Sequence, residues 1–121
     1  MIEHKHMIVR AECMKPPTED ELVVWLEELV ERLGMKILSG PHSGCVTEMP
    51  GNLGPTAVVI IETSHMAVHV WTDPDPALIQ LDVYTCGALD RDIVLDHLMQ
   101  WHPVKHDIKV FDREYKLEEI T

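Results

Sequence analysis

Apolar and polar residues alternate in several short stretches of the chain, which is the pattern of strands that bury one face. Two other stretches repeat their apolar residues at helical spacing. The first follows a capping box at Thr18–Glu21 and ends at Gly34, and the second begins after Asp90 and ends before Pro103. Residues 40–55, rich in glycine and proline, are predicted to form a loop. The strands are expected at residues 4–13, 35–39, 57–62, 65–71, 78–85 and 105–111.

The order of these elements predicts the architecture. The strands between residues 57 and 85 follow one another without a helix, whereas a wholly parallel sheet needs a long crossover between strands. We therefore expect an α+β fold, a two-layer sandwich in which two helices cover one face of a mostly antiparallel sheet. With 121 residues, the chain is expected to form a single domain over residues 1–121.

Charge and composition narrow the range of partners. The formal net charge of −11 argues against nucleic acid or an anionic membrane as a partner, but it is compatible with a cationic small molecule. No apolar run approaches the about 20 residues that span a bilayer, and the N-terminus lacks the apolar stretch of a signal peptide. Cys13, Cys45 and Cys86 show no CxxC spacing, so we expect reduced thiols in a cytoplasmic protein.

Ser64, His65, His69 and Cys86 place a hydroxyl, two imidazoles and a thiol in neighbouring predicted strands. Such groups favour acyl-transfer or proton-transfer chemistry over simple packing. Side chains alternate in direction along a strand, so both histidines are expected on the less apolar face of residues 65–71. The alternative interpretation is that they are ordinary polar residues on a solvated face.

Two other kinds of site are weighed against this one. His65 and His69, with Cys86 or His42, have the chemistry of zinc ligands, but histidines four residues apart bind metal most naturally on a helix. A Ser-His-Asp hydrolase would need Ser64 on a sharp strand-to-helix turn flanked by glycines, and its neighbours are Thr63 and His65. The sequence therefore favours neither a metal site nor a hydrolase triad.

The stretch from residue 56 to residue 87 resembles the processing and catalytic region of bacterial and archaeal S-adenosylmethionine decarboxylases. That region combines a valine-rich strand, a Ser-His pair, a His-x-Trp motif, an acidic residue and a Thr-Cys-Gly end. The matching residues here are Val58–Ile61, Ser64–His65, His69–Trp71, Asp82 and Thr85–Gly87. The chain is therefore identified as a member of this family.

The resemblance implies a proenzyme that cuts its own backbone between Thr63 and Ser64. The Ser64 hydroxyl would attack the Thr63 carbonyl, and elimination and hydrolysis would leave a pyruvoyl group at position 64. His69 matches the residue that removes the Ser64 α-proton, and Thr56 matches a hydroxyl that supports the acyl-shift intermediate. Cys86 matches the proton donor to the substrate, a role that suits a mostly protonated thiol.

The resemblance also implies a cofactor, a substrate and a partner. The pyruvoyl group would bind the substrate amine as a Schiff base and accept electrons during CO2 loss. The expected substrate is S-adenosylmethionine, decarboxylated to supply the aminopropyl donor for spermidine synthesis. The expected assembly is a homodimer with active sites near the interface.

The chain departs from the family pattern in two places. The residue before the serine, usually Glu, is Thr63, which leaves open a homologue that does not cleave and acts as a binding or regulatory module. No Phe, Tyr or Trp lies between Trp25 and Trp71, whereas the family stacks adenine on an aromatic residue there. A cationic amino acid such as ornithine or arginine therefore stays open as the substrate. The candidate substrate-binding residues are Glu48, His65, Trp71 and Asp73.

Overall fold

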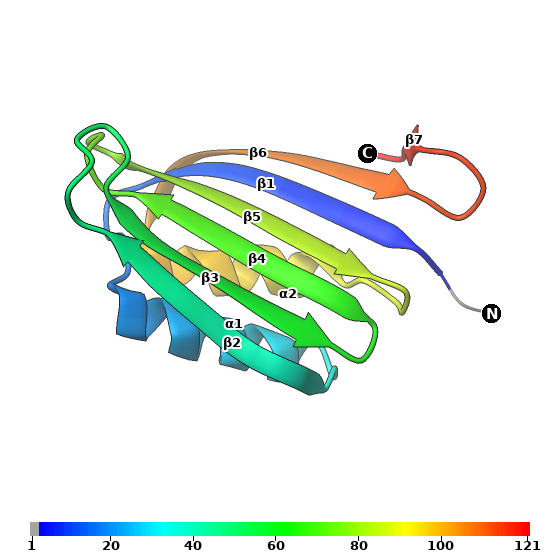
Figure 1. Cartoon of the computed structure of the whole chain (residues 1–121). Helices are drawn as coiled ribbons and strands as arrows, with labels where there is room; N and C mark the ends of the chain where they lie inside the picture. The colour runs from blue at the N-terminus through cyan, green and yellow to red at the C-terminus, as the bar shows by residue number, and fades with distance from the viewer. Residues whose placement is uncertain (1–2) are drawn as a thin grey trace.

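A seven-stranded antiparallel sheet forms the body of the computed structural model, which describes residues 3–121 (Figure 1). The order across the sheet is β2-β3-β4-β5-β1-β6-β7, and each neighbouring pair is antiparallel. The predicted α+β fold with an antiparallel sheet is confirmed. The strands are β1 (Lys5–Cys13), β2 (Ile37–Val46), β3 (Gly54–Ile61), β4 (Ser64–Trp71), β5 (Ala77–Thr85), β6 (Pro103–Asp112) and β7 (Glu118–Glu119).

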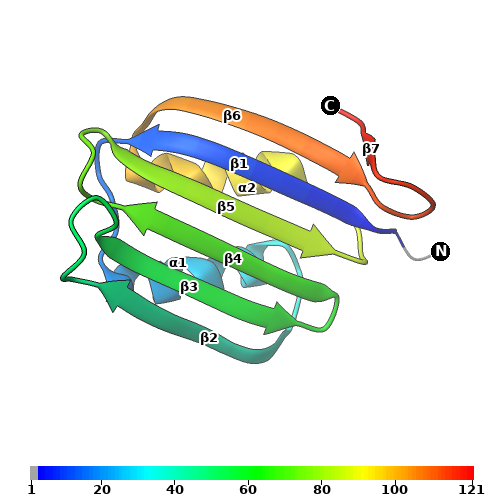
Figure 2. The same ribbon diagram turned by 45° about the horizontal axis from the view of Figure 1, so that its top comes forward.

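Helices α1 (Glu19–Arg32) and α2 (Arg91–Leu98) pack against the same face of the sheet, so the other face stays open (Figure 2). Thr18 caps α1 through the predicted capping box: its hydroxyl accepts from the Glu21 N–H, and its own N–H donates to the Glu21 carboxylate. The Asp90 carboxylate caps α2 by accepting from the first-turn amides. Both predicted helix starts are confirmed.

The core lies between the helices and the sheet. Along β4, Met66, Val68 and Val70 are buried and face the helices, while His65 and His69 face the open side, as the alternation predicts. The same period holds on β1, β3 and β5, where every second residue is buried. Within residues 3–121, no helix combines the length and apolar character needed to cross a membrane.

A buried histidine joins the two helices. The Trp25 indole N–H donates to the His97 carbonyl at 3.0 Å, and His97 Nε2 donates to the Trp25 carbonyl at 2.8 Å. His97 Nδ1 therefore accepts, and it lies 3.1 Å from Gln100 Nε2 and 3.3 Å from Arg32 Nη1. Burial is the main cause that lowers the pKa of His97. Trp25 also stacks on Trp101 of the 3-10 turn η1 (Met99–Trp101), with 4.1 Å between ring centroids.

The chain between the first helix and β3 differs from the prediction. In place of a short strand at residues 35–39 and a loop at 40–55, a longer strand β2 extends from Ile37 to Val46. Its pairing with β3 shifts register around Pro41. An edge strand leaves one side of its backbone unpaired, so it tolerates glycine, proline and irregular pairing. The loop prediction is therefore wrong for residues 40–46, and the true connection is shorter.

Candidate active site

A tight turn at one end of the sheet carries the predicted cleavage point. Only Glu62 and Thr63 separate β3 from β4, and Ser64, the first residue of β4, pairs with Thr85 of β5. Ser64 has a φ of 134°, in a region that favours glycine. Holding a serine there costs on the order of 1–3 kcal/mol. The backbone at the predicted scissile bond is therefore strained.

The end of β5 holds Thr63 by its backbone and its side chain. The Cys86 N–H donates to the Thr63 carbonyl at 2.6 Å. The Thr85 hydroxyl, which is fully buried, donates to the Thr63 hydroxyl at 3.0 Å and accepts from the Gly87 N–H at 3.0 Å. The Cys86 N–H is thus a donor to the carbonyl oxygen of Thr63. Such a donor stabilises the negative charge that develops on this oxygen when a nucleophile such as the Ser64 hydroxyl attacks the carbonyl carbon.

Cys86 brings a half-buried free thiol to the same end of the sheet. It follows directly after Thr85, which pairs with Ser64. The other two cysteines differ in character: Cys45 is exposed, and burial raises the pKa of the Cys13 thiol to about 11. Cys13 is therefore a protonated core residue, and among the three cysteines Cys86 is the one next to the residue that pairs with Ser64.

Thr56 and His69, both predicted to serve in processing, meet on the open face. They lie opposite each other on β3 and β4, and the Thr56 hydroxyl is hydrogen-bonded to His69 Nδ1 at 3.1 Å. The His69 ring also packs near Trp71, with 5.9 Å between ring centroids. The structure therefore brings these two residues together as one unit.

This unit lies far from Ser64 in the same chain. Ser64 begins β4 and His69 lies further along the same strand, which at roughly 3.3 Å per residue puts their Cα atoms about 16 Å apart. Thr56 is equally remote, because it pairs with His69 while Ile61 pairs with Ser64. A single chain therefore holds the two halves of the predicted machinery at separate places.

A polar cluster lies beside Ser64 on the open face. Tyr84 of β5 stands between His65 of β4 and His6 of β1, with 5.6 Å between its ring centroid and each of theirs. His6 Nε2 lies 2.6 Å from Asp82 Oδ1. The Arg113 guanidinium carbon lies 4.1 Å from the centroid of the Tyr84 ring. His65, predicted to contact substrate, is the member of this cluster that the sequence singled out as a site residue.

Sequence reasoning missed Tyr84 and Arg113. Tyr84 lies two residues before Cys86 in a predicted strand, so its face could have been deduced from the alternation. Arg113 follows the last long strand, and nothing local marks it. Only the sheet order, with β1 between β5 and β6, brings the ends of those strands together.

Trp71 and Asp73, two of the predicted substrate-binding residues, hold the β2–β3 connection at the other end of β4. The Trp71 indole N–H donates to Asn52 Oδ1 at 2.8 Å. The Asp73 carboxylate accepts from the Gly51 and Leu53 N–H groups, each at 2.8 Å, and these bonds lower the pKa of Asp73. Both side chains thus have partners within the chain.

Glu48 lies exposed in the same connection. Within one chain, Glu48, Trp71 and Asp73 are all remote from Ser64, since β4 runs between the two ends. Their contact with substrate stays a prediction.

The considered zinc site does not form in the described part of the chain. Among residues 3–121, no three His, Cys, Asp or Glu side chains gather closely enough to hold a metal ion. His65 packs against Tyr84 and His69 bonds to Thr56, so the two histidines have separate partners.

Comparison with known proteins gives a family. The S-adenosylmethionine decarboxylase family model matches residues 6–114. The S-adenosylmethionine decarboxylase proenzyme of Aquifex aeolicus (strain VF5) is 35% identical over 68 residues, 54% of this chain and 49% of that protein. The proenzyme of Geobacillus kaustophilus (strain HTA426) is 43% identical over 47 residues, 39% of this chain and 36% of that protein. The chain thus spans about half the length or less of these curated relatives.

A solved structure supports the fold. The crystal structure of the adenosylmethionine decarboxylase from Aquifex aeolicus VF5 aligns with a TM-score of 0.75 and 24% identity, covering 99% of this chain and 98% of that one. The family match includes the tight turn at Ser64, the Thr56–His69 pair and Cys86. The resemblance in the sequence is confirmed: the chain belongs to the S-adenosylmethionine decarboxylase family.

Proposed function

We propose that this protein is a self-processing decarboxylase that acts on S-adenosylmethionine and supplies the aminopropyl donor for polyamine synthesis. The observation that carries the proposal is the bond of 2.6 Å from the Cys86 N–H to the Thr63 carbonyl, next to the strained Ser64. The names of the relatives, S-adenosylmethionine decarboxylase proenzymes, support both the substrate and a chain that matures by cleavage.

Self-processing begins with the Ser64 hydroxyl. Its oxygen attacks the Thr63 carbonyl carbon, the peptide C–N bond breaks, and an ester links the two residues. The Cys86 N–H stabilises the oxyanion of this step, and the strain at Ser64 is released. Removal of the Ser64 α-proton then expels the Thr63 carboxylate and leaves dehydroalanine. Hydrolysis of dehydroalanine gives the pyruvoyl group at position 64 and ammonia, with fragments 1–63 and 64–121.

The residues around position 64 fit a pyruvoyl group and a decarboxylation. The group supplies a carbonyl that accepts electrons as CO2 leaves the substrate. Thr85 pairs with Ser64 and so fixes the neighbouring backbone. In this proposal the half-buried Cys86 thiol donates a proton to the substrate α-carbon.

Thr63 stands where the family usually has Glu, and its side chain has a hydrogen-bond partner in this structure. Its hydroxyl accepts from the buried Thr85 hydroxyl at 3.0 Å, so a threonine is held firmly next to the scissile bond. This contact favours a cleaving enzyme over the non-processing homologue. The names of the relatives likewise favour S-adenosylmethionine over ornithine or arginine.

We further propose a homodimer, formed through the open face of the sheet. The proton acceptor His69 is about 16 Å from Ser64 along one strand, so a second copy must supply it to complete the site. The open face carries the exposed apolar residues Ile8, Val58 and Ile60, which an interface between two copies would bury. We place the protein in the cytoplasm, because its free thiols fit a reducing compartment.

Mass spectrometry of the denatured protein tests the proposal. After prolonged incubation, wild-type protein should give fragments 1–63 and 64–121, the second with a blocked N-terminus, while Ser64→Ala stays intact. The matured protein should release CO2 from carboxyl-labelled S-adenosylmethionine but not from ornithine or arginine. Wild-type protein that stays uncleaved and releases no CO2 would overturn the proposal.

A further inference from the structure

Arg113, a cation without a carboxylate partner among residues 3–121, lies at the Ser64 end of the open face. Arg113 follows β6, and its backbone N–H donates to the His4 carbonyl at 2.9 Å, which fixes it beside the start of β1. The chain has 21 carboxylate side chains and 10 Lys and Arg residues. Arg113 nevertheless makes no ion pair with any carboxylate of residues 3–121.

The surroundings orient the Arg113 guanidinium without neutralising it. Its carbon lies 4.1 Å from the Tyr84 ring centroid, a stacking geometry that arginine favours. Nη1 lies 3.5 Å from His6 Nδ1, and His6 Nε2 is engaged by Asp82 at 2.6 Å. In the tautomer in which Nε2 donates to the carboxylate, Nδ1 accepts from the Arg113 guanidinium. Within one chain, the guanidinium therefore keeps donors that no carboxylate in the described part of the chain occupies.

Through Tyr84, Arg113 lies over the strand that leads to Cys86, which is next to the strand that begins at Ser64. Tyr84 pairs with His65, the neighbour of Ser64, and lies two residues before Cys86. A substrate whose amino group lies at position 64 reaches this guanidinium only if its α-carboxylate extends over the open face toward Tyr84. A planar guanidinium binds a carboxylate with two parallel hydrogen bonds.

We propose that Arg113 binds the α-carboxylate of the substrate and makes the site specific for an α-amino acid. The assignment rests on the proposed function and adds to it a recognition residue. It also accounts for product release, because the decarboxylated product has lost the group that the guanidinium holds.

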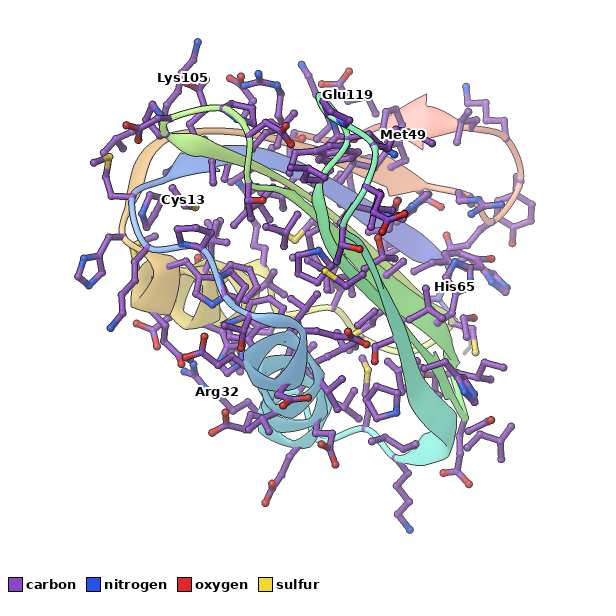
Figure 3. The ribbon with its side chains drawn as sticks, turned by 60° about the vertical axis from the view of Figure 1, so that its left-hand side comes forward. Cys13, Arg32, Met49, His65, Lys105 and Glu119 are labelled. Atoms are coloured by element: carbon purple, nitrogen blue, oxygen red, sulfur yellow. The ribbon has the colours of Figure 1, made fainter. Side chains whose placement is uncertain are left out.

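Arg113→Gln and Arg113→Lys test the assignment, with Lys105→Gln as the matched control. Lys105 pairs with Glu12 at the opposite end of β1, far from His65, so its change alters the net charge equally but leaves this corner intact (Figure 3). Two ligands are compared on matured protein: S-adenosylmethionine, and its methyl ester, in which the carboxylate charge is removed. The measurements are KM for the acid, the inhibition constant for the ester, and the rise in Tm that each ligand causes.

We expect Arg113→Gln to raise KM for the acid about 10–100-fold, because a charge-assisted pair is lost. The inhibition constant of the ester should change less than about twofold, and the Tm rise should shrink for the acid only. Arg113→Lys should fall between, and Lys105→Gln should match the wild type. Self-cleavage needs no substrate, so every variant should cleave normally.

The outcomes separate this assignment from the proposed function. If wild type and Arg113→Gln cleave and turn over alike, or if acid and ester weaken together, Arg113 does not bind the carboxylate and the proposed function stands. If the wild type neither cleaves nor gains Tm with S-adenosylmethionine, both the function and the assignment are overturned.

Discussion

Thr85 is the residue that links the fold to the proposed scissile bond between Thr63 and Ser64. It is fully buried, pairs with Ser64 across the β4–β5 ladder, and donates its hydroxyl to Thr63. We therefore regard it as a positioning residue, since it acts on the cleavage point without touching the attacked carbonyl.

Thr85→Val should slow self-cleavage about 5–10-fold, since it keeps the shape of the side chain and removes one hydrogen bond worth about 1 kcal/mol. Thr85→Ser retains the hydroxyl and should cleave at close to the wild-type rate. The cleaved fraction over time, followed by mass spectrometry, measures the effect. Valine and wild-type proteins that cleave equally fast would contradict this role.

Cys86 donates its backbone N–H to the Thr63 carbonyl, and in the proposed function its thiol donates a proton to the substrate. Cys86→Ala keeps the first group and loses the second. Cleavage should therefore continue, while kcat falls by about 10²–10⁴, the usual contribution of a general acid. Fragment masses and CO2 release measured on the same sample check both halves, and full turnover by the alanine variant would remove Cys86 as the proton donor.

At the scale of elements, two hydrogen bonds between His97 and Trp25 connect α2 to α1. His97 makes these contacts as a neutral imidazole, because its Nε2 donates and its Nδ1 accepts. Its Nδ1 accepts from Gln100 and faces Arg32, so a proton there would break both contacts. Burial lowers the pKa of His97 below its ordinary value of 6.5. The unfolded chain then binds the proton more readily than the folded one.

Stability from His97 should therefore be fully present above about pH 6.5 and should be lost as the pH falls through the lowered folded pKa. Tm measured between pH 7.5 and 5 should fall more steeply for the wild type than for His97→Gln. His106→Gln, at an exposed histidine, should retain the wild-type slope. Identical slopes for all three proteins would show that His97 does not govern this transition.

Elements with a strong local signal were predictable, and the edge of the sheet was not. The helix starts at Thr18 and Asp90 have capping side chains, and β4 and β5 have a clear period of two. Strand β2 lacks such a signal because it lies at the edge of the sheet and most of its side chains are exposed. Its sequence therefore does not alternate between apolar and polar residues. Its glycines and proline therefore pointed to a loop.

The site was predictable where its residues are close in the sequence. Ser64, Thr63 and Cys86 share one end of two neighbouring strands, and Thr56 meets His69 across one ladder. The distance between the Ser64 end and the Thr56–His69 pair depends on the extended shape of β4. A sequence motif gives the order of residues along the chain but not this distance. Tyr84 and Arg113 meet because of the sheet order, which depends on pairings between distant parts of the chain.

At the scale of the whole molecule, the proposed chemistry depends on the proposed homodimer, because Ser64 and His69 are far apart in one chain. If a second copy supplies the base, a chain with Ser64 but no His69 can be rescued by a chain with His69 but no Ser64. We expect His69→Ala and Ser64→Ala to stay largely uncleaved when each is made alone. Made together, they should yield fragments of the His69→Ala chain only.

Chains carrying tags of different mass identify which one is cut. A co-expressed pair of Cys45→Ser and Ser64→Ala chains serves as the control, since Cys45 is exposed near the far end of β2 and belongs to neither group. There the Cys45→Ser chain should be cut as in the wild type. No cleavage of the His69→Ala chain in the mixture would show that His69 does not act across the interface.

The place of β1 in the sheet determines what the proposed cleavage would do to the molecule. β1 belongs to the piece that ends at residue 63, yet it lies between β5 and β6, which belong to the piece that begins at residue 64. Strands of the two fragments therefore interleave in the sheet. Separating the fragments would break the backbone hydrogen bonds of the β1–β5, β1–β6 and β3–β4 pairs. The severed protein should therefore persist as one folded body, with its newly made chain end clamped in place until the whole domain unfolds.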